Sequence, residues 1–279
     1  MTQTGTLYLV ATPIGNMGDI TKRAIEVLES VDAVAAEDTR ISGSLLKKLD
    51  IKKPLISYYE HNAAMRGEKL ISLLESGKNI ALITDAGTPG ISDPGELMVK
   101  QCIVNGIEVI PVPGACAFVS ALIVSGFSTE HFTFIGFLPS KASEREKILE
   151  KYKNRSETLI FYEAPHKLMR TLEDMKNTFG ADRRIALCRE LTKLHEQTIR
   201  TTLGEAVEYF TATPPKGEFV LVIDGAPEQE LELTLDDALA LVERYRADGL
   251  SRKAACKKAA AETGLSSKEL YDSSLEANF

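Results

Sequence analysis

Cysteine and histidine are scarce in this sequence, and their spacing argues against a metal centre. The 279 residues include cysteines at positions 102, 116, 188 and 256 and histidines at 61, 131, 166 and 195. No two cysteines are close enough to form a metal-binding pair, and nothing in their spacing suggests a disulfide framework. The histidines lack metal-ligand spacing as well. We therefore expect no resident metal and a reducing, cytoplasmic setting.

The sequence also lacks any stretch that predicts a secretion signal or a membrane span. No basic residue precedes Lys22, and Thr12 and Pro13 interrupt the apolar stretch near the amino terminus. The richest apolar run, residues 115–127, contains two serines and a glycine. It is well short of the ~20 residues that a membrane helix requires. The sequence predicts a soluble protein.

Motifs of several common enzyme classes are missing. There is no Gly-x-x-x-x-Gly-Lys-Ser/Thr loop, and no Gly-x-Gly-x-x-Gly follows the first expected strand. The Gly-x-Ser-x-Gly turn of many hydrolases is absent too. These absences argue against a nucleoside triphosphatase, a Rossmann dehydrogenase and a serine hydrolase.

The composition is that of a globular chain with enough residues for two domains. Hydrophobic residues make up 44% of the sequence and charged residues 26%. The formal net charge is −7. An acidic chain is not expected to bind nucleic acid indiscriminately, but it can still carry a local basic surface.

Apolar runs alternate with amphipathic segments in the first half, which predicts repeated βα units. Expected strands cover residues 6–11, 32–36, 54–58, 79–84 and 107–112. Expected helices cover residues 20–30, 41–49, 63–76, 96–105 and 115–125. Units of this length predict a mostly parallel sheet with helices on both faces. We assign residues 1–118 to this first α/β domain.

The pattern becomes more mixed after Gly126. Expected strands cover residues 132–138, 158–163, 184–189, 197–203 and 218–223, and expected helices cover 143–153, 165–179 and a short segment from 205. We assign residues 119–226 to a second α/β domain with a mixed sheet, and residues 231–279 to a small helical segment. The last two helices of that segment resemble a helix-turn-helix, a pattern that lids and dimer arms share with modules that read nucleic acid.

The loop after the fourth expected strand is the most informative stretch. Residues 81–95 read ALITDAGTPGISDPG, a short apolar strand followed by three glycines, two prolines and two aspartates. Glycine permits the backbone angles of a tight loop that holds a ligand. The alternative is an ordinary strand-to-helix turn in which Asp93 caps the next helix.

Similar Gly/Pro-rich or charge-dense stretches follow nearly every expected strand. They begin at residues 12, 37, 58, 85 and 113 in the first half, and at 137, 163 and 189 in the second. Because parallel strands end at one edge of a sheet, these residues should converge in space. We predict a ligand-binding cleft between the two α/β domains.

Several of these stretches together resemble a known family. The resemblance rests on LYLVATPIGN at 7–16, AEDTR at 36–40, the loop at 85–95, PVPG at 111–114 and FYEAPHK at 161–167. They are similar to the bacterial ribosomal RNA small subunit methyltransferase I family, within the tetrapyrrole methylase superfamily. The resemblance covers residues 6 to about 225 and a similar helical tail. It implies a class III methyltransferase fold, with the cofactor in a cleft between two α/β domains, and a homodimer.

The resemblance also implies the reaction and the cofactor. Members of this family use S-adenosylmethionine to methylate the ribose 2′-hydroxyl of a cytidine in the decoding region of 16S rRNA, either as naked rRNA or in the small ribosomal subunit. The implied cofactor contacts are Pro13, Asp85, Gly87, Thr88, Ile91, Ser92, Ala115, Cys116 and Ala117. At Gly87-Thr88-Pro89 the sequence departs from the Gly-Asp-Pro of the tetrapyrrole branch, which favours the rRNA branch.

Methyl transfer to a hydroxyl requires alignment and a proton acceptor. The candidates at the expected cleft are Glu37, Asp38, Arg40, Glu163 and His166, with Glu163 or Glu37 as the acceptor and Arg40 as an orienting cation. Each has a structural alternative. The first three residues also suit an ion pair at a helix start, and His166 suits an ordinary position in the first turn of a helix.

An RNA substrate requires a local basic surface on this acidic chain. We expect it in residues 183–202, which supply Arg183, Arg184, Arg189, Lys193 and Arg200. Two other functions stay open. A small-molecule, tetrapyrrole-type methyltransferase of the same fold needs no basic surface, and a non-catalytic RNA-binding module needs no cofactor.

Overall fold

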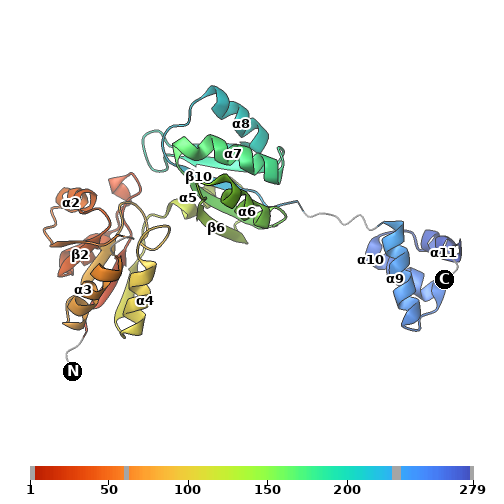
Figure 1. Ribbon diagram of the computed structural model, residues 1–279, viewed down its shortest axis with the longest axis horizontal. Helices are drawn as coiled ribbons and strands as arrows, with labels where there is room; N and C mark the ends of the chain where they lie inside the picture. Colours follow the sequence, from red (N-terminus) through yellow and green to blue (C-terminus); the bar gives the residue numbers. More distant parts are fainter. Residues whose placement is uncertain (1–3, 60–62, 228–233, 277–279) are drawn as a thin grey trace. The chain divides into compact units, whose positions relative to one another are not determined.

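The computed structural model describes residues 4–59, 63–227 and 234–276. The chain divides into two compact units, Met1–Ala226 and Pro227–Phe279 (Figure 1). The first unit contains two five-stranded sheets, and the second is helical.

The first sheet is entirely parallel and has the strand order β3-β2-β4-β1-β5. Its strands are β1 (Thr6–Val10), β2 (Ala33–Ala36), β3 (Leu55–Ser57), β4 (Ile80–Ile83) and β5 (Glu108–Val112). The helices of this part are α1 (Lys22–Ser30), α2 (Thr39–Lys48), α3 (Ala63–Glu75) and α4 (Glu96–Val104), with a short 3₁₀ helix at Met17–Asp19.

Alternation along the strands decides which helices cover which face. Ala81 and Ile83 of β4 pack with α1 and α2, whereas Ile80 and Leu82 pack with α3 and α4. Successive strand residues point to opposite faces, so a strand that is covered on both sides must be apolar throughout. All four residues of β4 are buried, as this arrangement requires.

The second sheet is mixed and has the order β6-β7-β10-β8-β9. Its strands are β6 (Phe132–Phe137), β7 (Thr158–Glu163), β8 (Arg184–Arg189), β9 (Gln197–Thr202) and β10 (Phe219–Ile223); only the β6–β7 pair is parallel. Helix α5 (Ala117–Ser125) packs on one face. The other face carries α6 (Ala142–Tyr152), α7 (Pro165–Phe179) and α8 (Leu203–Ala212) (Figure 1).

Local sequence signals start several of these helices. Asp38 caps α2 by accepting a hydrogen bond from the Arg40 amide, and Thr202 with Glu205 forms a complete capping box at α8. Pro165 stands at the first turn of α7, where its missing N–H costs nothing.

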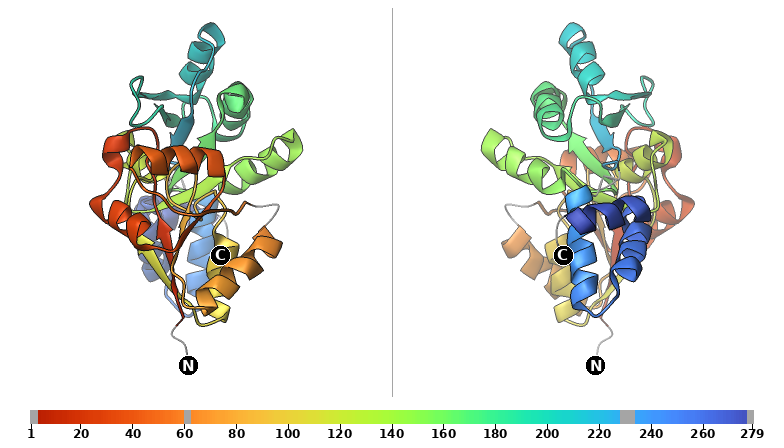
Figure 2. Two further views of the ribbon diagram at one scale, coloured as in Figure 1. Left: turned by 90° about the vertical axis from the view of Figure 1, so that its left-hand side faces the viewer. Right: turned by 90° about the vertical axis from the view of Figure 1, so that its right-hand side faces the viewer.

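The helical unit consists of α9 (Leu235–Ala247), α10 (Arg252–Thr263) and α11 (Ser267–Glu276) (Figure 2). Its core is small, and is built from Ala238, Val242, Tyr245, Ala255, Cys256, Ala259 and Leu270. Gly264, in the left-handed conformation, ends α10 and allows the chain to turn into α11.

The predicted α/β fold, with one parallel and one mixed sheet, is confirmed, and the expected elements lie within a few residues of the observed ones. The domain boundary after residue 118 stays a prediction. One alternative was wrong: Asp93 does not cap α4, because Gly95 holds the N-cap position. Within the described residues, no helix is both long enough and apolar enough to cross a membrane.

Candidate functional site

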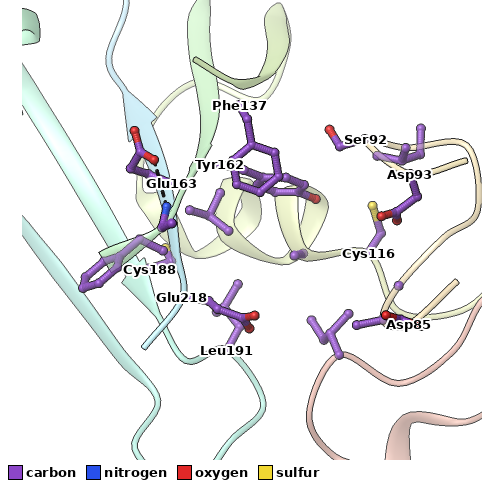
Figure 3. Close-up of a pocket in the computed structure, with 18 of the residues that line it drawn as sticks. Asp85, Ser92, Asp93, Cys116, Phe137, Tyr162, Glu163, Cys188, Leu191 and Glu218 are labelled. Carbon is purple, nitrogen blue, oxygen red and sulfur yellow. Dashed lines mark hydrogen bonds between the residues drawn. The ribbon is translucent and has the colours of Figure 1, made fainter. Parts of the chain in front are cut away.

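A pocket of about 450 Å³ opens among the loops that follow strands of the first sheet and the strands of the second sheet (Figure 3). The first sheet's loops supply Ile14, Glu37, residues 85–88 and 91–93, and Cys116–Ala117. The second sheet and its connections contribute Phe137, residues 162–165, Cys188, Leu191, Lys193 and residues 218–220. Its volume lies in the range of pockets that hold small ligands and cofactors.

Backbone bridges hold the loops of the first sheet together. The Thr12 amide donates to the Gly87 carbonyl at 2.8 Å, and the Gly87 amide returns a bond to the Thr12 carbonyl at 3.1 Å. The Thr88 hydroxyl donates to the Ala115 carbonyl at 3.1 Å. Gly87 has a φ of +94°, which an L side chain rarely adopts. The loops after β1, β4 and β5 are therefore fixed to one another.

A second close approach joins the loop after β4 to the second sheet. Ser92 lines the pocket with a φ of +59°, and a Cβ at Gly136 would lie 3.0 Å from the Ser92 hydroxyl oxygen. Gly136 itself has a φ of +77° and stands where the β6–β7 register shifts. A glycine at 136 therefore provides the space that Ser92 occupies.

Three carboxylates, Glu37, Asp85 and Asp93, belong to the first-sheet side of the pocket. The Thr84 hydroxyl donates to Glu37 at 3.0 Å, and the Asp38 amide donates to Asp85 at 3.2 Å. Burial, assisted by the negative charges of Glu37 and Asp85, raises the pKa of Asp93 to about 6. Burial also raises the pKa of Asp85, and the nearby Asp38 carboxylate adds to this effect. A ligand with positive charge would relieve the repulsion among these groups.

Aromatic rings form another part of the lining. The rings of Phe137 and Tyr162 meet edge to face, with centroids 5.5 Å apart and an interplanar angle of 62°. The Phe118 amide donates to the Tyr162 hydroxyl oxygen at 3.2 Å, and burial raises the pKa of this phenol. Tyr162 is therefore neutral, and its ring presents an apolar surface to the pocket.

Glu163 lines the pocket, and both oxygens of its carboxylate accept hydrogen bonds from the protein. Only 3% of it is exposed, and its two oxygens accept hydrogen bonds from the Ala164 amide at 2.8 Å and the Thr171 hydroxyl at 2.5 Å. Figure 3 shows its carboxylate across the pocket from Asp85 and Asp93. This pattern is that of a side chain that fixes the start of α7. His166 is exposed in the first turn of α7 and is not among the described residues that line the pocket.

A shallower groove of about 610 Å³ lies beside the pocket, and Asp85 lines both. The groove runs along one side of α2, with Arg40, Ile41, Ser44, Leu45 and Lys48, and past the loop after β1, with Thr12, Pro13, Gly15 and Met17. Asp38 completes it. The Arg40 side chain donates two hydrogen bonds to the Asp38 carboxylate, from Nε to Oδ1 at 3.0 Å and from Nη2 to Oδ2 at 2.6 Å. These bonds lower the pKa of Asp38 to about 2. The anticipated ion pair at this helix start is present.

Seven of the nine expected cofactor residues line the pocket: Asp85, Gly87, Thr88, Ile91, Ser92, Cys116 and Ala117. Pro13 lies in the groove, and the Ala115 carbonyl holds Thr88. Sequence reasoning missed Asp93, Phe137 and Tyr162 as lining residues. Asp93 belongs to the loop that the sequence predicted to hold a ligand, but it was named only as an alternative N-cap. Phe137 and Tyr162 were assigned to strands or strand ends and were given no contact with a ligand.

The five expected RNA-binding cations are all engaged within the chain. Arg183 donates to the carbonyls of Lys153 and Asp224, and Arg184 pairs with the Asp224 carboxylate. Arg189 donates to the Lys216 carbonyl, and Arg200 to the carbonyls of Val124 and Ser125. Lys193 pairs with Glu190 at 2.9 Å and Glu218 at 2.8 Å. These contacts tie together the elements around the second sheet.

Among the described residues, no group of three or more histidine, cysteine, aspartate or glutamate side chains is arranged to hold a metal ion. The four cysteines are free thiols, and only Cys116 is partly exposed. The described lining of the pocket includes carboxylates, backbone groups, apolar side chains and Lys193.

Residues 6–207 match the family model described as tetrapyrrole (corrin/porphyrin) methylases. A protein of Synechocystis named ribosomal RNA small subunit methyltransferase I is 49% identical over 98% of both chains. The Bacillus subtilis protein of the same name is 47% identical over 96% of this chain and 93% of its own.

Solved structures show the same fold at lower identity. The uroporphyrin-III-C-methyltransferase of Thermus thermophilus superposes with a TM-score of 0.57 and 22% identity, over 79% of this chain and 94% of that one. A cobalt precorrin-4 methyltransferase superposes with a TM-score of 0.54 and 19% identity, over 78% and 94%. At this identity the likeness concerns the fold alone.

Proposed function

The chain belongs to the tetrapyrrole methylase family, and from this premise we propose that it is an S-adenosylmethionine-dependent methyltransferase of 16S rRNA. Its target is the ribose 2′-hydroxyl of a cytidine in the decoding region. The relatives that share 44–49% identity with it carry a name that specifies the small-subunit rRNA. The observation that carries the proposal is the pocket with three carboxylates at the carboxyl edge of the parallel sheet.

The pocket residues suit this cofactor. When bound, S-adenosylmethionine supplies an electrophilic methyl group on a sulfonium and also carries an ammonium group. Glu37, Asp85 and Asp93 provide the complementary negative charge. Gly87 allows close approach of the backbone, and the small side chains of Cys116 and Ala117 leave room for an adenine. Phe137 and Tyr162 shield the opposite side from water.

We assign the substrate ribose to the groove beside the pocket, because Asp85 lines both spaces. In this position the Asp85 carboxylate accepts the proton of the 2′-hydroxyl. Its raised pKa makes it a stronger base than an ordinary aspartate. Arg40 keeps its charge in the pair with Asp38 and orients a neighbouring phosphate. Glu37 maintains the shape of the wall through Thr84.

Asp85 therefore replaces Glu163 as our candidate for the proton acceptor. A base must have an oxygen within hydrogen-bond reach of the proton that it takes, and each hydrogen bond from the protein leaves that oxygen less capacity to accept it. Among the described residues, both Glu163 oxygens accept hydrogen bonds from the protein, whereas Asp85 accepts one, from the Asp38 amide to Oδ1. We propose that Glu163 positions α7 and that Asp85 touches the substrate.

We further propose that the protein is a homodimer in the cytoplasm, where its substrate is assembled. Helix α5 has no charged residue and exposes Val119, Ile123 and Val124. Phe132 is also partly exposed, and its ring centroid lies 6.3 Å from that of Phe118 in α5. An apolar patch of this kind marks an interface more often than a free surface.

One assay tests the reaction. Purified protein is incubated with methyl-labelled S-adenosylmethionine and either small ribosomal subunits or naked 16S rRNA, and the labelled nucleoside is mapped. We expect label on the ribose of a decoding-region cytidine. Label on a base, or no label on either RNA, contradicts the proposal.

Two carboxylate variants test the roles of the side chains. Asp85→Asn should lower kcat roughly 100-fold or more, since a positioned base contributes roughly 10²- to 10⁴-fold in rate. Glu163→Gln should lower the melting temperature while the folded fraction keeps most of its kcat. The reverse result would return the role of acceptor to Glu163.

A further inference from the structure

The solvent-facing side of α10 carries an unusual concentration of positive charge. Arg252, Lys253, Lys257 and Lys258 lie in its first two turns, and Glu262 is the only acidic residue of the helix. The buried side consists of Ala255, Cys256 and Ala259. At 100° per residue, Lys253, Lys257 and Lys258 fall on the opposite side, interleaved with Ala254 and Ala261. We call these three lysines the α10 basic face.

The α10 basic face is not neutralised within the unit. Among the described residues, no carboxylate pairs with Lys253 or Lys257, and both side chains are exposed. Lys258 lies over the Tyr245 ring, with its Nζ 4.1 Å from the centroid, and Arg244 of α9 also stacks on Tyr245. The Glu262 carboxylate accepts a hydrogen bond from the Tyr245 hydroxyl at 2.7 Å. In contrast, the five cations of residues 183–202 all have partners in the chain.

Lysines four residues apart destabilise an isolated helix, because like charges at this spacing repel. Lys253 and Lys257 have this spacing. Release of that repulsion favours binding of a polyanion. Glu262 is the one acidic residue of α10, and the other acidic residues of the unit's described helices lie on α9 and α11. The first two turns of α10 therefore carry only basic charges, although the unit's described helices together carry no excess of basic residues.

The composition of the α10 basic face distinguishes between polyanions. A membrane-surface helix inserts an apolar side next to its cations, but the apolar side of α10 is buried in the core of the unit. A protein partner would need aromatic or aliphatic anchors at the centre of the contact, and this face offers only alanines between its lysines. Lysines with small neighbours suit an extended phosphodiester chain, which needs point charges and close approach.

We propose that the α10 basic face binds the phosphate backbone of the rRNA substrate, without reading bases. This proposal rests on the RNA substrate of the proposed function and adds a second contact to it, on the helical unit. The cations contribute affinity and salt dependence, and the reacting groups stay in the first unit.

The test compares two double variants of the full chain. Lys253→Ala/Lys257→Ala removes two charges from the proposed contact. Lys147→Ala/Lys151→Ala is the matched control, because it removes two lysines at the same spacing from exposed positions of another helix, α6, where Glu144, Glu146 and Glu150 surround them. Circular dichroism checks that both variants are folded, and calorimetry checks that both bind S-adenosylmethionine as the wild type does.

Binding of a 16S rRNA fragment is measured between 50 and 200 mM salt. For Lys253→Ala/Lys257→Ala we expect a slope of log affinity against log salt that is shallower by about 1.4, because each lost phosphate contact on a single strand removes about 0.7. The KM for rRNA should rise roughly tenfold with kcat little changed, and the control should match the wild type in both. Equal behaviour of the two double variants overturns this inference. A wild type that binds the cofactor but neither binds nor methylates rRNA overturns the proposed function itself.

Discussion

The Thr84 hydroxyl donates to the Glu37 carboxylate over 3.0 Å, and so joins the loops that follow β4 and β2. The Thr84 carbonyl also accepts a hydrogen bond from the Thr12 hydroxyl at 3.2 Å, which links the end of β1 to the same two loops. Thr84 is buried, so its polar atoms cannot turn to water. One threonine thereby connects three strand ends at the carboxylate wall of the pocket.

Replacement of this threonine by valine keeps the shape and removes the hydroxyl. Thr84→Val should weaken binding of S-adenosylmethionine about 10- to 100-fold, since a hydrogen bond to a charged group contributes about 1.5–3 kcal/mol. Titration calorimetry gives the affinity. Thr211→Val is the control, because Thr211 donates only to a carbonyl of its own helix α8. An unchanged affinity in Thr84→Val would show that Glu37 needs no support from Thr84.

Asp93 predicts a pH dependence of cofactor binding. Its pKa of about 6 means that it is protonated at pH 5 and ionised at pH 7. Only the ionised form attracts a cation, so affinity for S-adenosylmethionine should rise between pH 5 and 7 with a midpoint near 6. Calorimetry across this range measures it. Asp93→Asn should bind more weakly at pH 7 and lose this midpoint; a midpoint that persists in the variant would assign it to another group.

The same residue affects stability with the opposite sign. The folded state holds the Asp93 proton more tightly than the unfolded chain does, because burial raises the pKa from 3.8. The stability that this proton contributes is present below about pH 4 and is lost as the pH rises through 6. Asp93→Asn should therefore raise the melting temperature at pH 7 and leave it nearly unchanged at pH 4.

The fold was largely predictable because its signals are local. The buried strands β4 and β10 are apolar throughout, and glycine marks several loop positions with positive φ, such as Gly87, although Ser92 also has a positive φ. Parallel pairing then brought Glu37 and Asp85 to one edge, as the parallel sheet predicted from the sequence implied.

The partners of individual side chains were not predictable, because they depend on contacts between distant segments. Arg200, for example, donates to the Ser125 carbonyl, 75 residues away in the chain. Even the nearer hydrogen bond from the Thr171 hydroxyl to the Glu163 carboxylate depends on how β7 and α7 pack. Sequence shows a charge but not whether it is satisfied. For this reason the sequence could not show that Glu163 accepts two hydrogen bonds from the protein, or that the five cations of residues 183–202 have partners within the chain; their roles in catalysis and RNA binding stay predictions.

The exposed face of α5 predicts the oligomeric state. Ile123 is 69% exposed on a helix that has no charged residue. Ile123→Glu would place a charge in the proposed interface, and burying it there is unfavourable. We expect a dimer for the wild type and a monomer for this variant in sedimentation equilibrium. Leu275→Glu, at an exposed apolar position of α11, should remain a dimer. A dimeric Ile123→Glu would place the interface elsewhere.

Gly136 predicts a coupling between the second sheet and the cofactor. Gly136→Ala adds a Cβ that would lie 3.0 Å from the Ser92 hydroxyl oxygen, in addition to the cost of a φ of +77°. Gly180→Ala is a close control, because Gly180 has a φ of +95° and open space around its missing Cβ. A side chain at such angles costs roughly 1–2 kcal/mol, so urea unfolding should show both variants destabilised by about that amount. Only Gly136→Ala also brings a Cβ into close contact with Ser92, which lines the pocket, so it alone should lose affinity for S-adenosylmethionine. Equal affinities would mean that Ser92 can move without disturbing the site.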